Sequence, residues 1–242
     1  MDDVAERLPS WVRWQQRPFP DANLLLLPGR HPALIDSGFV GHAEQTADWV
    51  QANSRQLTLV VNTHWHAHHV GGNGLLQSQG AGIAASVPDT HAVNRRDPGC
   101  CVAEYLDQPV APYAIDEALT DGQTLTLGDT QWQVIGTPGH TPGHLCLWQP
   151  DEQLLVTGYA LSDYDVGWVN IALDGADAAA TARASLQRLV DLAPASCSRP
   201  TALSPLTPPP PSPSPSAAPN DSSTTPMARS GTAHAASSPT PS

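Results

Sequence analysis

Apolar and polar positions alternate in short blocks along most of the chain, and the first blocks have the pattern of strands. Residues 23–27 and 33–36 are two predicted strands, and the Pro28-Gly29 pair between them indicates a hairpin turn. Residues 57–61 form a continuous apolar run, which is typical of a strand covered on both faces. The first sheet is therefore predicted to begin as a hairpin and to continue into a buried strand.

Two longer segments have the spacing of helices. Residues 42–53 carry a ragged apolar face, and a last helix is expected from a cap at Asp174 to about Leu192. The buried stripe of that last helix is predicted to contain Leu186, Leu189 and Val190. Strand-like blocks lie between the two helices at residues 81–86, 123–127, 131–135 and 145–148. This alternation predicts mixed sheets covered by helices.

The composition changes abruptly after Arg199, where the chain becomes rich in Pro, Ser, Thr and Ala. Twelve of the 25 prolines lie in this last part, and such a segment cannot bury enough apolar surface to offset its ordering entropy. We expect one folded domain over residues 1–198 and a disordered tail over residues 199–242. A frameshift would explain the sudden switch, and the coding DNA would show it.

The charge of the chain narrows the classes of partner. A formal net charge of -12 and the absence of lysine argue against a nucleic-acid or anionic-membrane partner. A small-molecule substrate is expected instead. Acidic residues stand near the start where a secretory signal has basic ones, and no apolar run is long enough to span a bilayer, so we expect a cytoplasmic protein.

Histidines are concentrated directly after the buried strand. Four of them, His64, His66, His68 and His69, lie within six positions, in the segment T-H-W-H-A-H-H-V-G-G-N that begins at Thr63. Neutral imidazole nitrogens at about 2.0–2.1 Å are what a tetrahedral zinc ion requires. Scattered surface histidines are the alternative, but this density favours a metal site.

A second segment, T-P-G-H-T-P-G-H from Thr137 to His144, also follows a predicted strand. Its proline and glycine residues make a tight loop that can present His140 accurately. Alone, this segment would be an ordinary turn. Together with the first cluster it indicates two loops that share one metal site.

The two segments closely resemble the motifs T-H-x-H-x-D-H-x-G-G-N and T-P-G-H-T-x-G-H of the metallo-β-lactamase superfamily, which includes glyoxalase II, lactonases and lactamases. The resemblance implies an α/β fold, an αββα four-layer sandwich of two mixed β-sheets flanked by helices. It also implies that His64, His66 and His140 bind a first zinc ion and that His69 binds a second. Asp36 matches an aspartate that braces the histidine loop, and His144 matches a residue behind the ligands.

Three departures from the family pattern concern the second metal. His68 stands at the position of the aspartate that binds that metal and orients the attacking water, so it is our candidate for the catalytic position. Tyr159 replaces a bridging aspartate and either fills space or ligates as a phenolate; we favour the first interpretation. The P-G-H-G segment that carries a last histidine is not found, so the last strand is expected to be missing. One zinc ion is expected, and a second is doubtful.

The resemblance thus predicts a zinc-type hydrolase that cleaves a small ester, thioester, lactone or lactam through a metal-bound hydroxide, slowly because its second metal site is impaired. The alternative is a defunct relative that binds one metal or none. An iron-dependent persulfide dioxygenase is disfavoured, because that class needs an aspartate at the Tyr159 position. Asp163 or Asp165 could offer a replacement carboxylate. No residue pattern identifies the substrate pocket or the oligomeric state.

Overall fold

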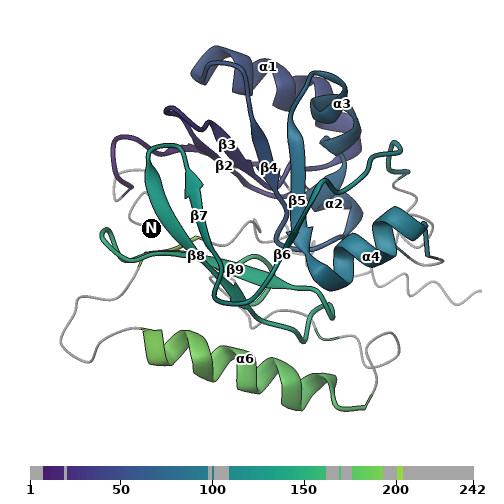
Figure 1. The fold of residues 1–242 in the computed structure, drawn as a ribbon, viewed down its shortest axis with the longest axis vertical. Helices are drawn as coiled ribbons and strands as arrows, with labels where there is room; N and C mark the ends of the chain where they lie inside the picture. Colours follow the sequence, from purple (N-terminus) through teal and green to yellow (C-terminus); the bar gives the residue numbers. More distant parts are fainter. Residues whose placement is uncertain are drawn as a thin grey trace, which may run out of the picture. The chain divides into compact units, whose positions relative to one another are not determined.

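The strands form two sheets, as the computed structural model of the chain shows (Figure 1). It describes residues 8–18, 21–97, 100, 109–161, 169, 176–192 and, for the backbone, 201–203. The first sheet has the order β1 (Arg13–Gln15), β2 (Leu24–Leu27), β3 (Ala33–Ile35), β4 (Leu59–Val61), β5 (Gly82–Ser86) and β6 (Glu117–Leu119). The second has the order β11 (Thr201–Leu203), β10 (Leu154–Val156), β9 (Leu145–Gln149), β8 (Thr130–Gly136) and β7 (Thr124–Leu127).

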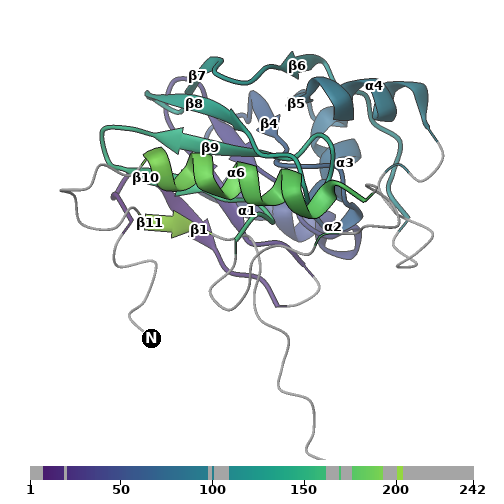
Figure 2. The same ribbon diagram turned by 90° about the horizontal axis from the view of Figure 1, so that it is seen from below.

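Helices cover the outer face of each sheet. The first sheet is covered by α1 (Ala43–Asn53), α3 (Asn73–Ser78) and α4 (Val87–Arg95). The short helix η2 (Val40–His42) precedes α1, and the short helix α2 (Ala67–Val70) precedes α3. The second sheet is covered by α6 (Ala178–Leu192), which lies in front of β9 and β10 in Figure 2. Both sheets are mixed, because β3 to β6 run parallel and β1 to β3 antiparallel, while β11 is the parallel strand of the second sheet. The predicted four-layer α/β sandwich is confirmed.

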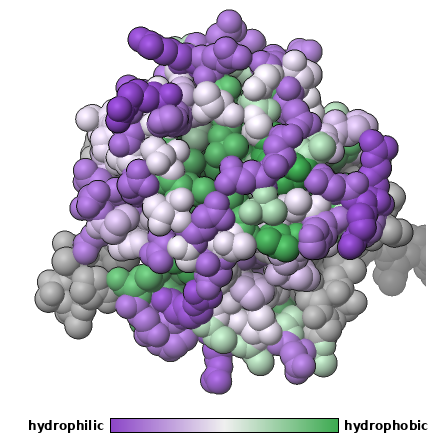
Figure 3. All heavy atoms as spheres, in the orientation of Figure 1, coloured by the Kyte–Doolittle hydropathy of each residue, from purple (hydrophilic) through white to green (hydrophobic). Residues whose placement is uncertain are grey.

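The run Leu24–Leu27 illustrates why the predicted strands are apolar on both faces. Side chains alternate across a strand, so Leu25 and Leu27 pack between the two sheets while Leu24 and Leu26 pack against the helices. Full burial of a leucine is worth about 1.5–3 kcal/mol, so this strand fixes two layers at once. Figure 3 shows the resulting surface, with hydrophilic side chains around its margin and apolar ones nearer the middle. Within the described ranges, no helix is long and apolar enough to cross a membrane.

The expectation that the last strand is missing is wrong. Residues Thr201–Leu203 pair with β10 in parallel register, from Leu154 with Thr201 to Val156 with Leu203. Three residues inside a proline-rich segment are too short to show a period, and backbone hydrogen bonds to the edge of β10 decide the structure here. The strand carries no histidine. The rest of the proposed tail, from residue 204, lies outside the described residues.

The buried stripe of α6 agrees with its prediction at Leu189, which is buried, and at Leu186, which packs against the same cluster, but differs at Val190. Val190 is 65% exposed, and the buried side chains are Ala178, Ser185 and Leu189. Small residues are needed on this face because the loop after β8 approaches closely: a Cβ at Gly139 would lie 2.5 Å from the Cα of Ala182. A three-residue apolar pattern could not reveal that contact. The expected cap at Asp174 lies outside the described residues.

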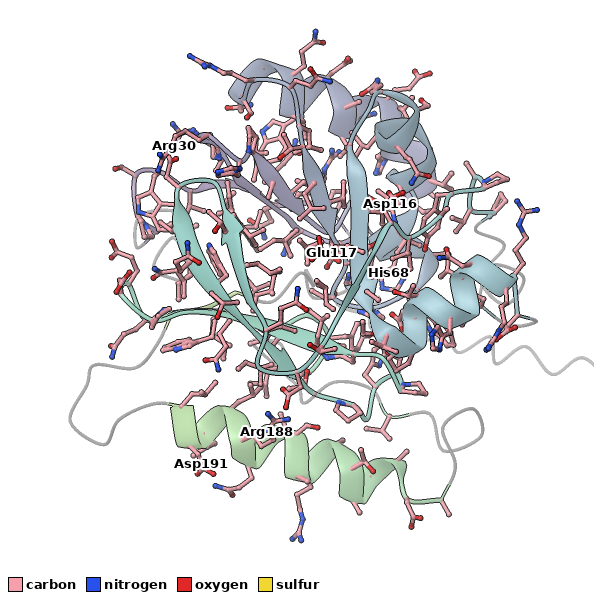
Figure 4. The ribbon with its side chains drawn as sticks, viewed as in Figure 1. Arg30, His68, Asp116, Glu117, Arg188 and Asp191 are labelled. Atoms are coloured by element: carbon pink, nitrogen blue, oxygen red, sulfur yellow. The ribbon has the colours of Figure 1, made fainter. Side chains whose placement is uncertain are left out.

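Polar contacts complete the docking of α6 on the second sheet. Ser185 donates from Oγ to the carbonyl of Pro138 over 2.7 Å. Arg188, labelled in Figure 4, points from α6 towards the sheet, donating to the carbonyl of Gly136 over 2.7 Å and to Asp121 over 2.9 Å. The helix is thereby tied to the end of β8 and to the loop that leads from this strand to His140.

Candidate metal centre

The first histidine segment lies at the edge where three parallel strands end, and the second segment lies against it. Strands β3, β4 and β5 are parallel, so Asp36, the segment after Val61, and Ser86 meet at their carboxyl ends. The second segment connects β8 to β9, and the N–H of Leu145 donates to the carbonyl of Thr63 over 2.9 Å. That hydrogen bond joins the two sheets and brings the two histidine loops together.

Three histidines converge at this edge. The ligating atoms of His64, His66 and His140 lie within 4.8 Å of one another, and all three residues are buried. Nε2 of His140 is 2.9 Å from Nδ1 of His66, and the three rings meet nearly edge to face at 4.6–4.8 Å between centroids. In the part of the chain that the structure describes, no carboxylate joins this group. The structure therefore places together the three residues that the resemblance assigns to the first metal.

Hydrogen bonds to Nδ1 orient the rings of His64 and His69 and leave Nε2 of each ring available to a metal ion. Asp36 accepts hydrogen bonds from the N–H of Thr63 (2.8 Å) and from its hydroxyl (2.9 Å), and Nδ1 of His69 lies 2.8 Å from the same carboxylate. The Thr63 hydroxyl donates its hydrogen to Asp36 and can therefore only accept a second hydrogen bond. Nδ1 of His64, 3.1 Å away, must then be the donor. Both rings then carry their proton on Nδ1, and the lone pairs lie on Nε2.

Those two Nε2 atoms, together with Nδ1 of His68, are buried and have no hydrogen-bond partner within the described residues. An unsatisfied buried polar atom costs about 1–3 kcal/mol, so three of them in one place need an explanation. Burial, and then the neighbouring histidines, lower the pKa values of His64, His66 and His68 well below 6.5, which keeps these rings neutral. Neutral imidazoles with free lone pairs fit a zinc-type cation.

His144 has a different position, because both of its nitrogens are already used. Nδ1 lies 2.7 Å from the hydroxyl oxygen of Thr137, and Nε2 accepts from the N–H of Tyr159 over 2.9 Å. Burial lowers the pKa of this ring as well. His144 therefore holds the Tyr159 segment against the second loop and has no lone pair left for a metal.

Tyr159 and His68 occupy the positions where the family pattern has aspartates. The ring of Tyr159 stacks flat on that of His140, with 4.1 Å between centroids and 7° between planes. This face-to-face packing favours the space-filling interpretation over a phenolate ligand. His68, labelled in Figure 4, is buried in α2 with its ring 4.5 Å from that of His69. Asp163 and Asp165 lie outside the described residues.

The sequence interpretation missed a buried carboxyl group that lies next to the histidine loops. Asp89, in the first turn of α4, is 1% exposed, and neither of its oxygens has a well-aligned hydrogen bond to a described residue. Burial raises its pKa from 3.8 to about 7, although the hydroxyl of Ser86 and the N–H of Trp65 act in the opposite direction. The S-x-x-D spacing from Ser86 to Asp89 is a helix-start signal that could have drawn attention to it.

This pKa predicts how Asp89→Asn changes the stability of the metal-free protein. Between pH 3.8 and about 7 the folded chain keeps a proton that the unfolded chain has released, so rising pH lowers the free energy of unfolding. Asparagine has no such proton, and we expect the variant to match the wild type at pH 4 and to exceed it by about 4 kcal/mol at pH 8, because each unit of pKa shift is worth about 1.4 kcal/mol. Urea unfolding at pH 4, 6 and 8 measures this. A difference that does not change with pH would contradict it.

Comparison with known proteins is consistent with the fold and the motifs. The sequence profile described as "Metallo-beta-lactamase superfamily" matches residues 19–196. Hydroxyacylglutathione hydrolase from Methylococcus capsulatus is 32% identical over 130 residues, which are 53% of this chain and 42% of that enzyme. Its counterpart from Rhodobacter capsulatus is 36% identical over 113 residues, 46% of this chain and 37% of the enzyme. The chain thus spans less than half the length of these relatives.

Solved structures share the fold at lower identity. A metallo-beta-lactamase family protein from Thermus thermophilus superposes with a TM-score of 0.65 at 21% identity, covering 76% of this chain and 71% of its own. The protein TTHA1623, solved in a di-iron-bound form, superposes with a TM-score of 0.64 at 23% identity, covering 81% of this chain and 93% of its own. Identities this low establish the common fold alone.

Proposed function

Because the chain belongs to the metallo-beta-lactamase superfamily, we propose that it is a metal-dependent hydrolase with one tight metal site formed by His64, His66 and His140. The observation that carries this proposal is the convergence of three buried imidazoles whose ligating atoms lie within 4.8 Å. Three histidines with one open position are the ligand set of several catalytic zinc sites, so zinc is the proposed ion. When bound, it would lower the pKa of a water molecule and polarise a carbonyl group.

Other residues around the first metal site orient its ligands or could bind a second ion. Asp36 and Thr63 fix the tautomers of His69 and His64, and thus direct their lone pairs into the site. His69 and His68 offer two further nitrogens for a second ion, but among the described residues no carboxylate joins the three histidines as in the family pattern. We therefore propose that the second metal binds weakly, with His68 at the catalytic aspartate's position, and that turnover is slow.

A cavity that reaches one of the three histidines, His140, supports a small acyl substrate. It measures about 310 Å³, at the lower end of the range for ligand pockets, and His140 and Tyr159 form part of its wall. Pro138, Ala160, Ala182 and Leu186 make much of the remainder apolar. We propose that it receives the apolar part of an ester, thioester, lactone or lactam. The two relatives compared above are named hydroxyacylglutathione hydrolases, and an acyl group on glutathione is a thioester, which makes a thioester the first substrate to test.

The test is a metal count combined with an activity measurement. Protein purified from zinc-replete medium is weighed by native mass spectrometry, and hydrolysis of an acyl thioester and of a lactone is followed. One bound zinc per chain with slow, zinc-dependent hydrolysis is the expected result. A chain that binds no zinc, or that binds one and hydrolyses neither substrate, is a defunct member of the family, and the proposal is then wrong.

The weak second site predicts the effect of restoring carboxylates. The double variant His68→Asp and Tyr159→Asp is expected to bind between one and two zinc ions and to raise kcat/KM by about tenfold, since carboxylates are good zinc ligands. Full restoration is not expected, because no last histidine is present on β11. His91→Asp, which changes an exposed histidine on α4, is the matched control. Unchanged stoichiometry and activity in the double variant would contradict this account of the second site.

A further inference from the structure

The carboxyl group of Asp89 lies behind both loops that carry the proposed metal ligands. Its helix begins directly after β5, where Ser86 caps the first turn by accepting the N–H of Asp89 over 3.3 Å. Because β5 runs parallel to β4, this first turn is adjacent to the histidine segment that follows β4. Asp89 is therefore brought to the site by the order of the strands, although it is distant from His140 in the sequence.

On the first loop, Asp89 meets the backbone of Trp65. The N–H of Trp65 lies close enough to the Asp89 carboxyl to lower its pKa against the effect of burial, without making a well-aligned hydrogen bond. Trp65 stands between His64 and His66, two of the three proposed ligands. A shift of this single peptide would therefore move both imidazoles at once.

On the second loop, Asp89 meets Gly143. A Cβ at position 143 would overlap with the carboxyl oxygen Oδ1 of Asp89 and with the hydroxyl of Ser86, so the backbone of this loop packs directly on the two side chains. Gly143 is in the same tight loop as His140, the third proposed ligand. The carboxyl group thus touches both loops, while His66 and His140 approach each other at 2.9 Å.

We propose that Asp89 is a positioning residue that sets the spacing between the two ligand loops, through Trp65 on one side and Gly143 on the other. A carboxyl group that served only the helix start would face the N–H groups of its own first turn, whereas this one faces the backbone of both ligand loops. The proposal rests on the metal site assigned above, and it adds a residue that the two histidine motifs do not contain.

Three variants test it. Asp89→Ala removes the acceptor beside Trp65, and Asp89→Asn keeps an oxygen there. Asp116→Ala is the matched control, because Asp116 accepts the N–H of Ile83 over 2.9 Å near the opposite end of β5. Zinc affinity is measured by competition with a chelator, and the geometry of the site by the visible spectrum of the cobalt-loaded protein. The contact between Asp89 and Trp65 is measured by hydrogen exchange of the Trp65 amide in the metal-free protein.

We expect Asp89→Ala to weaken zinc binding about 10- to 100-fold, as loss of a group that orients ligands does elsewhere. It should also shift the cobalt spectrum and speed Trp65 exchange about tenfold or more. Asp89→Asn should stay within about threefold of the wild type in zinc affinity, and Asp116→Ala should be unchanged. If Asp89→Ala does not fold, Asp89→Ser gives the same comparison, because its short hydroxyl cannot replace the carboxyl.

If Asp89→Ala has the same zinc affinity, cobalt spectrum and Trp65 exchange rate as the wild type, the proposal is wrong. A wild-type chain that binds no zinc would instead overturn the proposed function. In that case the exchange of the Trp65 amide still decides whether Asp89 holds the loop, so the two failures are distinguishable.

Discussion

His66→Ala is expected to abolish zinc binding and zinc-dependent hydrolysis while it stabilises the metal-free protein in mild acid. The variant removes Nδ1 of His66, which lies 2.9 Å from Nε2 of His140, and leaves two imidazoles at the first site. Loss of a direct ligand should exceed the 10- to 100-fold that loss of an outer partner costs, so we expect affinity to fall by more than about 100-fold. Zinc competition and metal analysis measure this.

The opposite effect on the metal-free protein follows from the lowered pKa values. Burial, and then nearby histidines that include His66, hold the pKa of His64 well below 6.5 in the folded chain, whereas the unfolded chain takes up a proton near that pH. Falling pH therefore lowers the free energy of unfolding, and removal of His66 reduces that loss. His91→Ala, at an exposed position, should change neither quantity. A variant whose free energy of unfolding falls as steeply between pH 7 and pH 5 as that of the wild type would show that His66 does not lower the pKa of His64.

Asp36→Ala is expected to lower the free energy of unfolding by at least about 3 kcal/mol, since each buried donor left without an acceptor costs about 1–3 kcal/mol. It leaves three buried donors without an acceptor: the N–H and hydroxyl of Thr63 and Nδ1 of His69. Asp36 also has a φ of 58°, which alanine adopts less readily than aspartate or asparagine. Urea unfolding of the metal-free protein measures the loss.

Asp36→Asn separates the hydrogen bonds from the backbone strain. Asparagine tolerates this φ and can accept the N–H of Thr63, but its amide group cannot accept the other two donors. We expect about half the loss of the alanine variant and a change of the His69 tautomer that removes its Nε2 lone pair. Asp129→Asn breaks an exposed pair with Arg30 and should leave the free energy of unfolding unchanged, because solvent screens such a pair. If Asp36→Asn is as stable as the wild type, Asp36 does not brace the loop.

The two predictions describe a conflict between stability and function at the metal site. In the metal-free chain, Nε2 of His64 and of His69 are buried without hydrogen-bond partners, which lowers the free energy of unfolding. Binding of an ion to these atoms would stabilise the folded state by mass action. Added zinc should therefore raise the midpoint of thermal unfolding in the wild type and leave it unchanged in His66→Ala.

Much of the fold is visible in local patterns. The hairpin of β2 and β3, the buried strand β4 and helix α1 were all predicted within two residues, because apolar blocks and turn residues act over short distances. Strand β11 was not predicted, because a three-residue edge strand has no period. On α6, Leu186 and Leu189 pack as predicted but Val190 does not, and the small residues that contact Gly139, far away in the sequence, were not foreseen. Predictions failed where a distant segment decided the outcome.

The sequence by itself determined which residues can ligate a metal. The spacing of His64, His66 and His140 in two loops after strands identifies the candidates, because strand ends and tight turns are local structures. The tertiary structure alone decided which nitrogens are free, since that depends on the hydrogen bonds of Asp36, Thr63 and Thr137. It also decided that a buried carboxyl group on α4 supports both loops. Burial and the pairing of distant atoms exist only after the chain has folded, and they set the pKa values and lone pairs on which the chemistry depends.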